Sequence, residues 1–320
     1  MGIVSLLPFV TEPWQIYLII FFLNIFNAFF TPAYKAALPQ AIDDKSNYAS
    51  GIALSNATNQ LLGVLGPGIA GGLAAWLGAR EIFFVDAASF IIAGVFVLTL
   101  PSLLVPRDAG AKAVQAARVW TDVLKGTRLL FADRAIRFAL LMELVAAIAG
   151  AQLLVNTVGY IIGTLQLTSK HYGYAMAAFG LGATVAAFAS GNFDRSRNRT
   201  TSLLLGGVVV CVSVALGNYA AFPFLVVLWL LEGFSQTLAE MPTQILIAER
   251  TPAEDHGKVY GAHFAWTHLW WAVAYPIAGL TSTFFPRIEF VVGASLAFVV
   301  FVTLVIISKL PSQHSATAVP

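Results

Sequence analysis

Long apolar runs recur along the whole chain, and they constrain its fold more than any other feature. We place nine of them, near residues 15–38, 50–77, 81–101, 136–162, 170–192, 201–219, 222–247, 261–284 and 288–309. A run of roughly 20 residues is long enough to cross a hydrocarbon layer of about 30 Å as a helix. Only 11% of the residues are charged, against about 25% in soluble domains. We therefore predict an all-α, polytopic membrane protein whose solvent is the lipid bilayer.

Charge and motifs argue against several other functions. The net charge is only +2, and the basic residues lie in short loops instead of one patch, so we expect no nucleic-acid partner. The single cysteine, Cys211, permits neither an internal disulfide nor a cysteine metal site. The sequence contains no phosphate-binding loop, metalloprotease motif or nucleophile elbow. We expect no enzyme, no bound ATP, no cofactor and no metal.

One long polar connection divides the chain. We predict a partial N-terminal helix bundle, a cytoplasmic linker, a C-terminal six-helix bundle and a cytoplasmic tail, at residues 1–101, 102–135, 136–310 and 311–320. The second half of the linker places apolar and charged residues on opposite faces of a helix. We expect this helix to lie on the inner membrane surface, and a soluble linker helix is the alternative.

The distribution of basic residues predicts the orientation. Of the 18 Lys and Arg residues, fourteen fall in loops on one side of the predicted membrane and three on the other. Because Lys and Arg are retained on the cytoplasmic side, the side with fourteen is the inner one. We expect a multi-pass protein of the plasma membrane, in bacteria the inner membrane, with a cytoplasmic C-terminus.

An internal repeat relates the two parts of the chain. Pro32–Gly51 and Pro242–Gly261 have equal length, and each runs from a helix end through a charged loop into the next helix. Duplicated halves are typical of secondary transporters. Six apolar runs follow the linker, but only three complete runs precede it. Residues 1–10 add an apolar segment that is about half as long as a membrane crossing requires. Matched halves would therefore need about two and a half further helices at the front.

Several stretches resemble the major facilitator superfamily, in particular its bacterial branch of enterobactin-exporter-like and transmembrane secretion effector permeases. Within 50–77, the string LLGVLGPGIAGGLAAWLG resembles the antiporter motif of the family's fifth helix, through Gly66, Pro67, Gly71 and Gly72. The loop residues Asp194, Arg195 and Arg197 resemble the second copy of the family's Asp-Arg loop. The resemblance implies a major facilitator-type fold lacking about two and a half N-terminal helices.

Both motifs also have purely structural readings. Glycines and a proline let two helices approach closely and bend, with or without a role in gating. The charged loop residues could clamp helix ends through charge-assisted bonds, or they could be a solvated loop that obeys the charge rule.

Ionisable groups within apolar runs are costly and indicate function. Glu232, Gln236 and Glu240 are spaced four residues apart and form one polar stripe on a helix, while Glu143 and Asp86 lie in other runs. A carboxylate in a low-dielectric cavity can exchange a proton with either side as access alternates, so Glu143, Glu232, Glu240 and Asp86 are our candidates for proton coupling. The alternative is that helix-end amides or neighbouring polar groups satisfy these carboxylates.

Uncharged polar and aromatic residues provide candidates for a substrate cavity. They are Asn24, Asn27, Asn56, Gln60, Asn156, Gln236, His263 and Trp270. An aromatic and polar lining suits an organic substrate. Hydrogen bonds between helices, or anchoring of Trp at the membrane interface, are the alternatives.

By this resemblance the chain would be a secondary active transporter. We expect proton-coupled efflux of a small organic molecule by alternating access, with the small-molecule substrate and protons as its partners and with a monomer as the working unit. The alternative is a truncated chain that does not transport, or a partner subunit.

Overall fold

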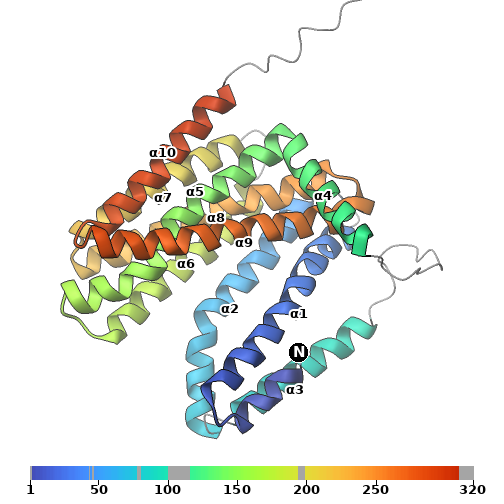
Figure 1. Cartoon of the computed structure of the whole chain (residues 1–320), viewed down its shortest axis with the longest axis horizontal. Helices are drawn as coiled ribbons and strands as arrows, with labels where there is room; N and C mark the ends of the chain where they lie inside the picture. Colours follow the sequence, from blue (N-terminus) through green and yellow to red (C-terminus); the bar gives the residue numbers. More distant parts are fainter. Residues whose placement is uncertain are drawn as a thin grey trace, which may run out of the picture. The chain divides into compact units, whose positions relative to one another are not determined.

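The architecture, seen in a computed structural model, consists of helices. The structure describes residues 2–42, 44, 47–77, 81–99, 116–193 and 199–309, and this part of the chain contains no strand. Long helices follow one another along the sequence, from α1 to α10 (Figure 1). The predicted all-α class is confirmed.

Each predicted apolar run lies on an α-helix, and the linker adds one more. The helices are α1 Pro13–Gln40, α2 Tyr48–Leu77, α3 Ile82–Thr99, α4 Ala116–Ala132, α5 Arg134–Gly159, α6 Ser169–Phe193, α7 Arg199–Leu216, α8 Phe222–Arg250, α9 His256–Phe284 and α10 Glu289–Lys309. Short helical turns lie between them: η3 Tyr160–Thr164, η4 Gly217–Tyr219 and η5 Ala253–Asp255. A helix satisfies its backbone within its own segment, which is what hydrocarbon demands.

Six helical segments of the described chain are long and apolar enough to cross a membrane. They are Pro13–Gln40, Arg134–Thr164, Lys170–Ala189, Arg199–Tyr219, Phe222–Arg250 and Glu289–Ser308. A shorter apolar helix spans Ile82–Phe96. Large apolar side chains are exposed on several helices, such as Ile91 and Phe96 of α3 at 65% and 69%. Such outward apolar faces suit lipid, and crossing by α2, α3 and α9 stays a prediction.

Residues 2–9 form a 3-10 helix, η1 Gly2–Phe9, where the sequence predicted the end of a membrane-spanning helix. Pro8 has no backbone N–H to donate, which disfavours regular α-helical bonding there. η1 packs against α1 and α3, and the rings of Phe9 and Phe84 meet edge to face at a centroid distance of 6.0 Å.

By their contacts, the residues group into two compact units. Unit 1 is Met1–Leu130 with Gln244–Ala265, and unit 2 is Phe131–Thr243 with Trp266–Pro320. The end of α8 and the beginning of α9 therefore belong to unit 1. The predicted division of the chain at residues 102–135 stays a prediction.

Unit 2 is built around α5. This helix begins at the N-cap Asp133, whose carboxylate accepts hydrogen bonds from the backbone N–H groups of Ala135 and Ile136 at 2.8 and 3.0 Å. It then packs against both α7 and α10, as Figure 1 shows. Almost every residue in its middle is buried. A helix with no continuous exposed apolar face is the interior element of a bundle.

Glycines bring α6 and α8 into direct backbone contact. A side chain at Gly182 of α6 would overlap the carbonyl oxygen of Leu230, and one at Gly233 of α8 would overlap that of Phe179. Such small-residue contacts are how helices associate where lipid removes the hydrophobic driving force.

This contact predicts a strong difference between two glycines of the same helix. Gly182→Ala should destabilise the protein by about 1–3 kcal/mol, since the added methyl group has only backbone to push against. Gly173→Ala should be neutral or stabilising by up to about 1 kcal/mol, because no described atom lies within 4 Å of the new methyl group. Apparent Tm in detergent checks the pair, and equal values would contradict the backbone contact.

The linker helix α4 is bound to the start of α9. The Nζ atom of Lys125 lies 2.7 Å from a carboxylate oxygen of Asp255, and Lys258 lies 3.1 Å from Asp255 and 3.6 Å from Asp122. Gly126 allows α4 to rest on the backbone of Lys258. The hydrogen bond from Lys125, with a second from Lys258, lowers the pKa of Asp255 despite its burial. Ion pairs thus connect one face of α4 to the start of α9, whereas Leu124 of α4 is exposed.

The ion pairs of Asp255 predict a pH-dependent stability. Asp255→Asn should cost about 1 kcal/mol at neutral pH, because Asp255 is buried but Lys125 is half exposed. A carboxyl whose folded pKa is lowered stabilises the fold above its usual pKa of about 3.9, and this contribution is lost as the pH falls through the lower folded value.

The apparent Tm of the two proteins should therefore differ at pH 7 and converge in acid. Glu254→Gln is the matched control, since this neighbouring carboxylate is exposed and should change little. A Tm of Asp255→Asn equal to that of the unchanged protein at pH 7 would contradict the role of the ion pairs.

Candidate functional site

Unit 1 contains a cavity of about 480 Å³ between polar and aromatic side chains. The described residues that line it are Asn27, Phe30, Thr31, Tyr34, Lys35 and Leu38 of α1, Ile52, Ser55, Asn56 and Asn59 of α2, Gln244 of α8 and Tyr260 of α9. Its volume falls in the range of small-molecule sites, about 300–1,000 Å³.

Helical periodicity directs the α1 side chains into the cavity. Asn27, Thr31 and Lys35 are separated by four residues each, so they follow one face of the helix. Phe30 and Tyr34 lie on the same side with their rings stacked at a centroid distance of 6.1 Å. One wall of the cavity therefore combines amide, hydroxyl, ammonium and aromatic groups.

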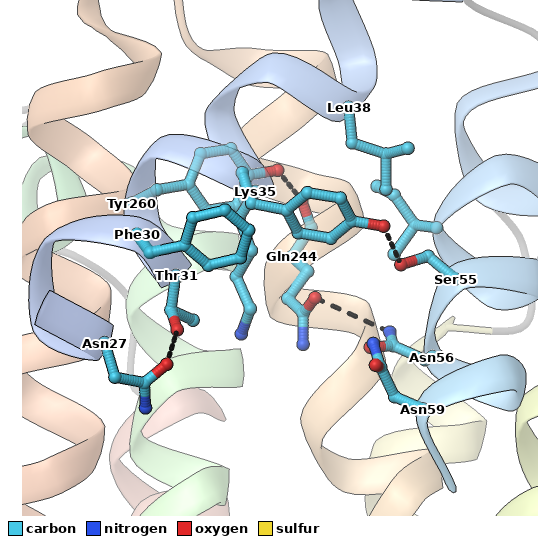
Figure 2. Close-up of a pocket in the computed structure, with 12 residues that line it drawn as sticks. Asn27, Phe30, Thr31, Lys35, Leu38, Ser55, Asn56, Asn59, Gln244 and Tyr260 are labelled. Atoms are coloured by element: carbon cyan, nitrogen blue, oxygen red, sulfur yellow. Dashed lines mark hydrogen bonds between the residues drawn. The ribbon is translucent and has the colours of Figure 1, made fainter. Parts of the chain in front are cut away.

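Hydrogen bonds connect the lining residues (Figure 2). The hydroxyl of Thr31 donates to Oδ1 of Asn27 at 3.0 Å, and the hydroxyl groups of Tyr34 and Ser55 lie 2.9 Å apart. Nδ2 of Asn56 lies 3.5 Å from Oε1 of Gln244. The hydroxyl of Tyr260 in α9 donates to the backbone carbonyl of Gln244 in α8 at 2.8 Å.

Both copies of the sequence repeat contribute to this cavity. Tyr34 and Gln244 occupy equivalent positions in the two segments, and both line the same space. The repeat therefore brings together residues that are about two hundred positions apart in the chain.

Some of the predicted cavity residues lie here and others do not. Asn27 and Asn56 line the cavity, whereas Asn24 and Gln60 are outside the set of described lining residues. The amide of Asn24 instead donates to the backbone carbonyl of Ile20 at 2.8 Å. Lys35 was not predicted, although its four-residue spacing from Thr31 is the same signal that indicated the stripe in α8.

The polar stripe of α8 lies inside unit 2. Glu232 is completely buried, and both of its carboxylate oxygens have no hydrogen-bond partner among the described residues. Nε2 of Gln236 donates to Oε1 of Glu240 at 2.8 Å. Gly150 of α5 leaves the space that Gln236 occupies, since a side chain at Gly150 would come within 2.8 Å of Oε1 of Gln236.

A second buried polar cluster joins α5 to α9. Oε1 of Gln152 accepts from Nδ2 of Asn156 at 2.9 Å and from the hydroxyl of Thr281 at 2.8 Å. Asn156 also donates to the backbone carbonyl of Ala278 at 3.3 Å. These bonds between helices are the structural alternative that the sequence left open for Asn156.

The remaining predicted site residues lie on α3, α5 and α9, outside the groups described above. Glu143 of α5 and His263 of α9 are buried, at 6% and 3% exposed. Asp86 of α3 is exposed. Trp270 lies partly buried, with its ring 5.2 Å from that of Trp266. Their roles in coupling or substrate binding stay predictions.

Two predicted motifs cannot be placed in detail. Gly66, Pro67, Gly71 and Gly72 fall within α2, but their surroundings lie outside what the structure describes. Asp194, Arg195 and Arg197 lie outside the described residues altogether. Within the described chain, no group of three or more His, Cys, Asp or Glu side chains could hold a metal ion.

Comparisons with known proteins agree with this architecture. The family model of the Major Facilitator Superfamily matches residues 1–161 and again residues 144–319. The chain is 23% identical over 309 residues to YfiS of Bacillus subtilis (strain 168), described as an uncharacterized MFS-type transporter, covering 91% of this chain and 69% of that protein. The crystal structure of the human organic anion transporter MFSD10 (TETRAN) superposes with a TM-score of 0.69 at 16% identity, over 85% of this chain and 67% of that one.

Proposed function

Because the chain belongs to the major facilitator superfamily, a family of secondary transporters, we propose that it exports a small organic molecule in exchange for protons by alternating access. Family and fold support a transporter of small molecules in a membrane and not an enzyme. The direction of transport, the coupling to protons and the class of substrate are the parts that we propose.

The observation that carries the proposal is the burial of Glu232. An isolated carboxylate is expensive to bury as a charge, so it must bind a proton or gain a partner. Glu232 has no described hydrogen-bond partner, and Glu240 lies on the same stripe of α8, two helical turns away. A group that is sealed in one state and reached by water in another would take up a proton from one side and release it to the other.

The unit 1 cavity is the proposed place of the substrate. It offers hydrogen-bonding and aromatic groups from four helices in a space of about 480 Å³. Substrate sites formed between repeats are typical of secondary transporters, and both repeat segments line this cavity. MFSD10 is named as a transporter of organic anions, which makes organic acids a natural part of any substrate screen.

The cellular setting follows from the same reasoning. We propose a monomer in the plasma membrane, the inner membrane in bacteria, with the C-terminus in the cytoplasm, because that orientation places most Lys and Arg residues inside. The enterobactin-exporter-like branch stays our proposal for its relationship within the family.

The proposal predicts a selective loss of proton coupling in a Glu232 variant. The chain is reconstituted in liposomes loaded with a pH-sensitive dye, and small organic acids, amides and amines are added from outside. At least one compound should drive proton movement through the unchanged protein. Glu232→Gln should reduce this signal to the level of empty liposomes, since the amide cannot exchange a proton.

Exchange of labelled compound for unlabelled compound should persist in Glu232→Gln, because exchange needs no net proton movement. Glu249→Gln, an exposed glutamate on the same helix, should behave like the unchanged protein. Proton movement that is undiminished in Glu232→Gln would remove this carboxylate from the mechanism.

A further inference from the structure

Two arginines and a set of apolar side chains meet where two membrane-crossing segments end. One of these segments begins at Arg134 of α5, and another ends at Ser308 of α10. The two helices pack side by side (Figure 1), and the side chain of Arg134 bonds to the backbone of Ser308. The start of α5 and the end of α10 therefore lie at the same boundary of the membrane.

A pocket of about 230 Å³ lies between these two helix ends. Its described lining residues are Arg134, Arg137, Phe138 and Leu141 of α5 with Leu304, Ile307 and Ser308 of α10. Steps of three and four residues keep each set on one face of its helix. Along α5 the lining changes from guanidinium groups at the boundary to apolar groups further into the crossing segment.

Backbone carbonyls orient both guanidinium groups. Nη2 of Arg134 donates to the carbonyl of Ser308, and Nη1 of Arg137 donates to that of Phe131 at 2.6 Å. A carbonyl is neutral, so these bonds leave the positive charges in place. Because a guanidinium group has five N–H donors, each arginine keeps donors for a further acceptor. Such planar forks match the oxygen atoms of a phosphate group.

The apolar part of the lining favours a lipid over a soluble ion. Ile307 is 59% exposed, and Phe138, Leu141 and Leu304 are partly exposed. A phospholipid places its phosphate at the membrane boundary and its acyl chains beside the helices, so its polar and apolar parts follow the order of the lining. The pocket is smaller than the usual 300–1,000 Å³ of small-molecule sites, which suits a headgroup whose chains lie outside it.

We propose that the pocket between α5 and α10 binds an anionic phospholipid, with Arg134 and Arg137 on its phosphate and Leu141 and Leu304 against its acyl chains. Basic pockets between membrane-crossing helices bind such headgroups on the cytoplasmic side, which is the side of this pocket in the orientation that we propose. The site shares no residue with the unit 1 cavity or the stripe of α8, and it does not depend on the proposed transport.

Two lipids with identical acyl chains test the charge preference. Dioleoyl phosphatidylglycerol is an anion, whereas dioleoyl phosphatidylcholine has no net charge. The purified full chain in detergent is mixed with equal amounts of both, and native mass spectrometry counts the bound lipids. A hydrogen bond to a charged group changes affinity by about tenfold to a hundredfold. The first bound lipid should therefore be the glycerol lipid at least about tenfold more often.

Substitutions of the two arginines assign this preference to the pocket. Arg134→Gln combined with Arg137→Gln should reduce it to about twofold or less, because the charges are lost. Lysine at both positions should retain part of it, since lysine keeps the charge but not the fork. Arg287→Gln is the matched control, because it removes an exposed arginine just before the other end of α10 and should leave the preference unchanged.

A further variant decides the question if the arginine variants do not fold. Ser308→Asp adds a carboxylate to the pocket lining and should remove the preference in the same way. Glycerol 3-phosphate at the lipid concentration should not displace the bound lipid, because it has no acyl chains.

Four results would overturn the proposal. They are equal binding of the two lipids to the unchanged protein, an undiminished preference in the arginine-to-glutamine and Ser308→Asp variants, an equal loss in Arg287→Gln, and displacement by glycerol 3-phosphate. The last result would indicate a site for soluble phosphates in place of a lipid site.

Discussion

Unpaired backbone groups cannot be tolerated in hydrocarbon, and the rest of this molecule follows from that constraint. Every long segment becomes a helix because only a helix satisfies its own amides within one segment. Without a hydrophobic drive between helices, contact depends on small residues, as where Gly182 and Gly233 let α6 and α8 touch through their backbones. Polar side chains then have to lie inside, where they bond to each other or perform chemistry.

The two units use buried polarity differently. In unit 2 the cluster of Gln152, Asn156 and Thr281 is joined by hydrogen bonds, whereas Glu232 lacks a described partner. In unit 1 polar and aromatic side chains surround a cavity, and Asp255, His256 and His263 are buried as well. We therefore propose proton coupling for the buried carboxylate of α8 and ligand binding for the cavity between α1, α2, α8 and α9.

Periodicity and run length predicted the helices well, because the requirement for about 20 apolar residues leaves little freedom. The run at 15–38 became Pro13–Gln40, but the first residues formed the 3-10 helix η1, since so short a segment with Pro8 has no regular pattern to read. Within the cavity, Asn27 and Asn56 could be found from their helix faces. Gln244 could not, because only folding brings the second repeat segment to the first. Nor could the sequence separate Asn24 from Asn27, as the two differ by less than one helical turn.

The central claim is that this chain moves a molecule against its own gradient by using a gradient of protons, without ATP. The most direct measurement places the purified chain in liposomes with a pH gradient as the sole energy source and follows the labelled compound that gives the largest proton signal. The account predicts accumulation above the outside concentration on the acidic side of the membrane, and collapse of that accumulation when a protonophore is added. Movement that stops at equal concentrations, unaffected by the protonophore, would contradict secondary active transport by this chain.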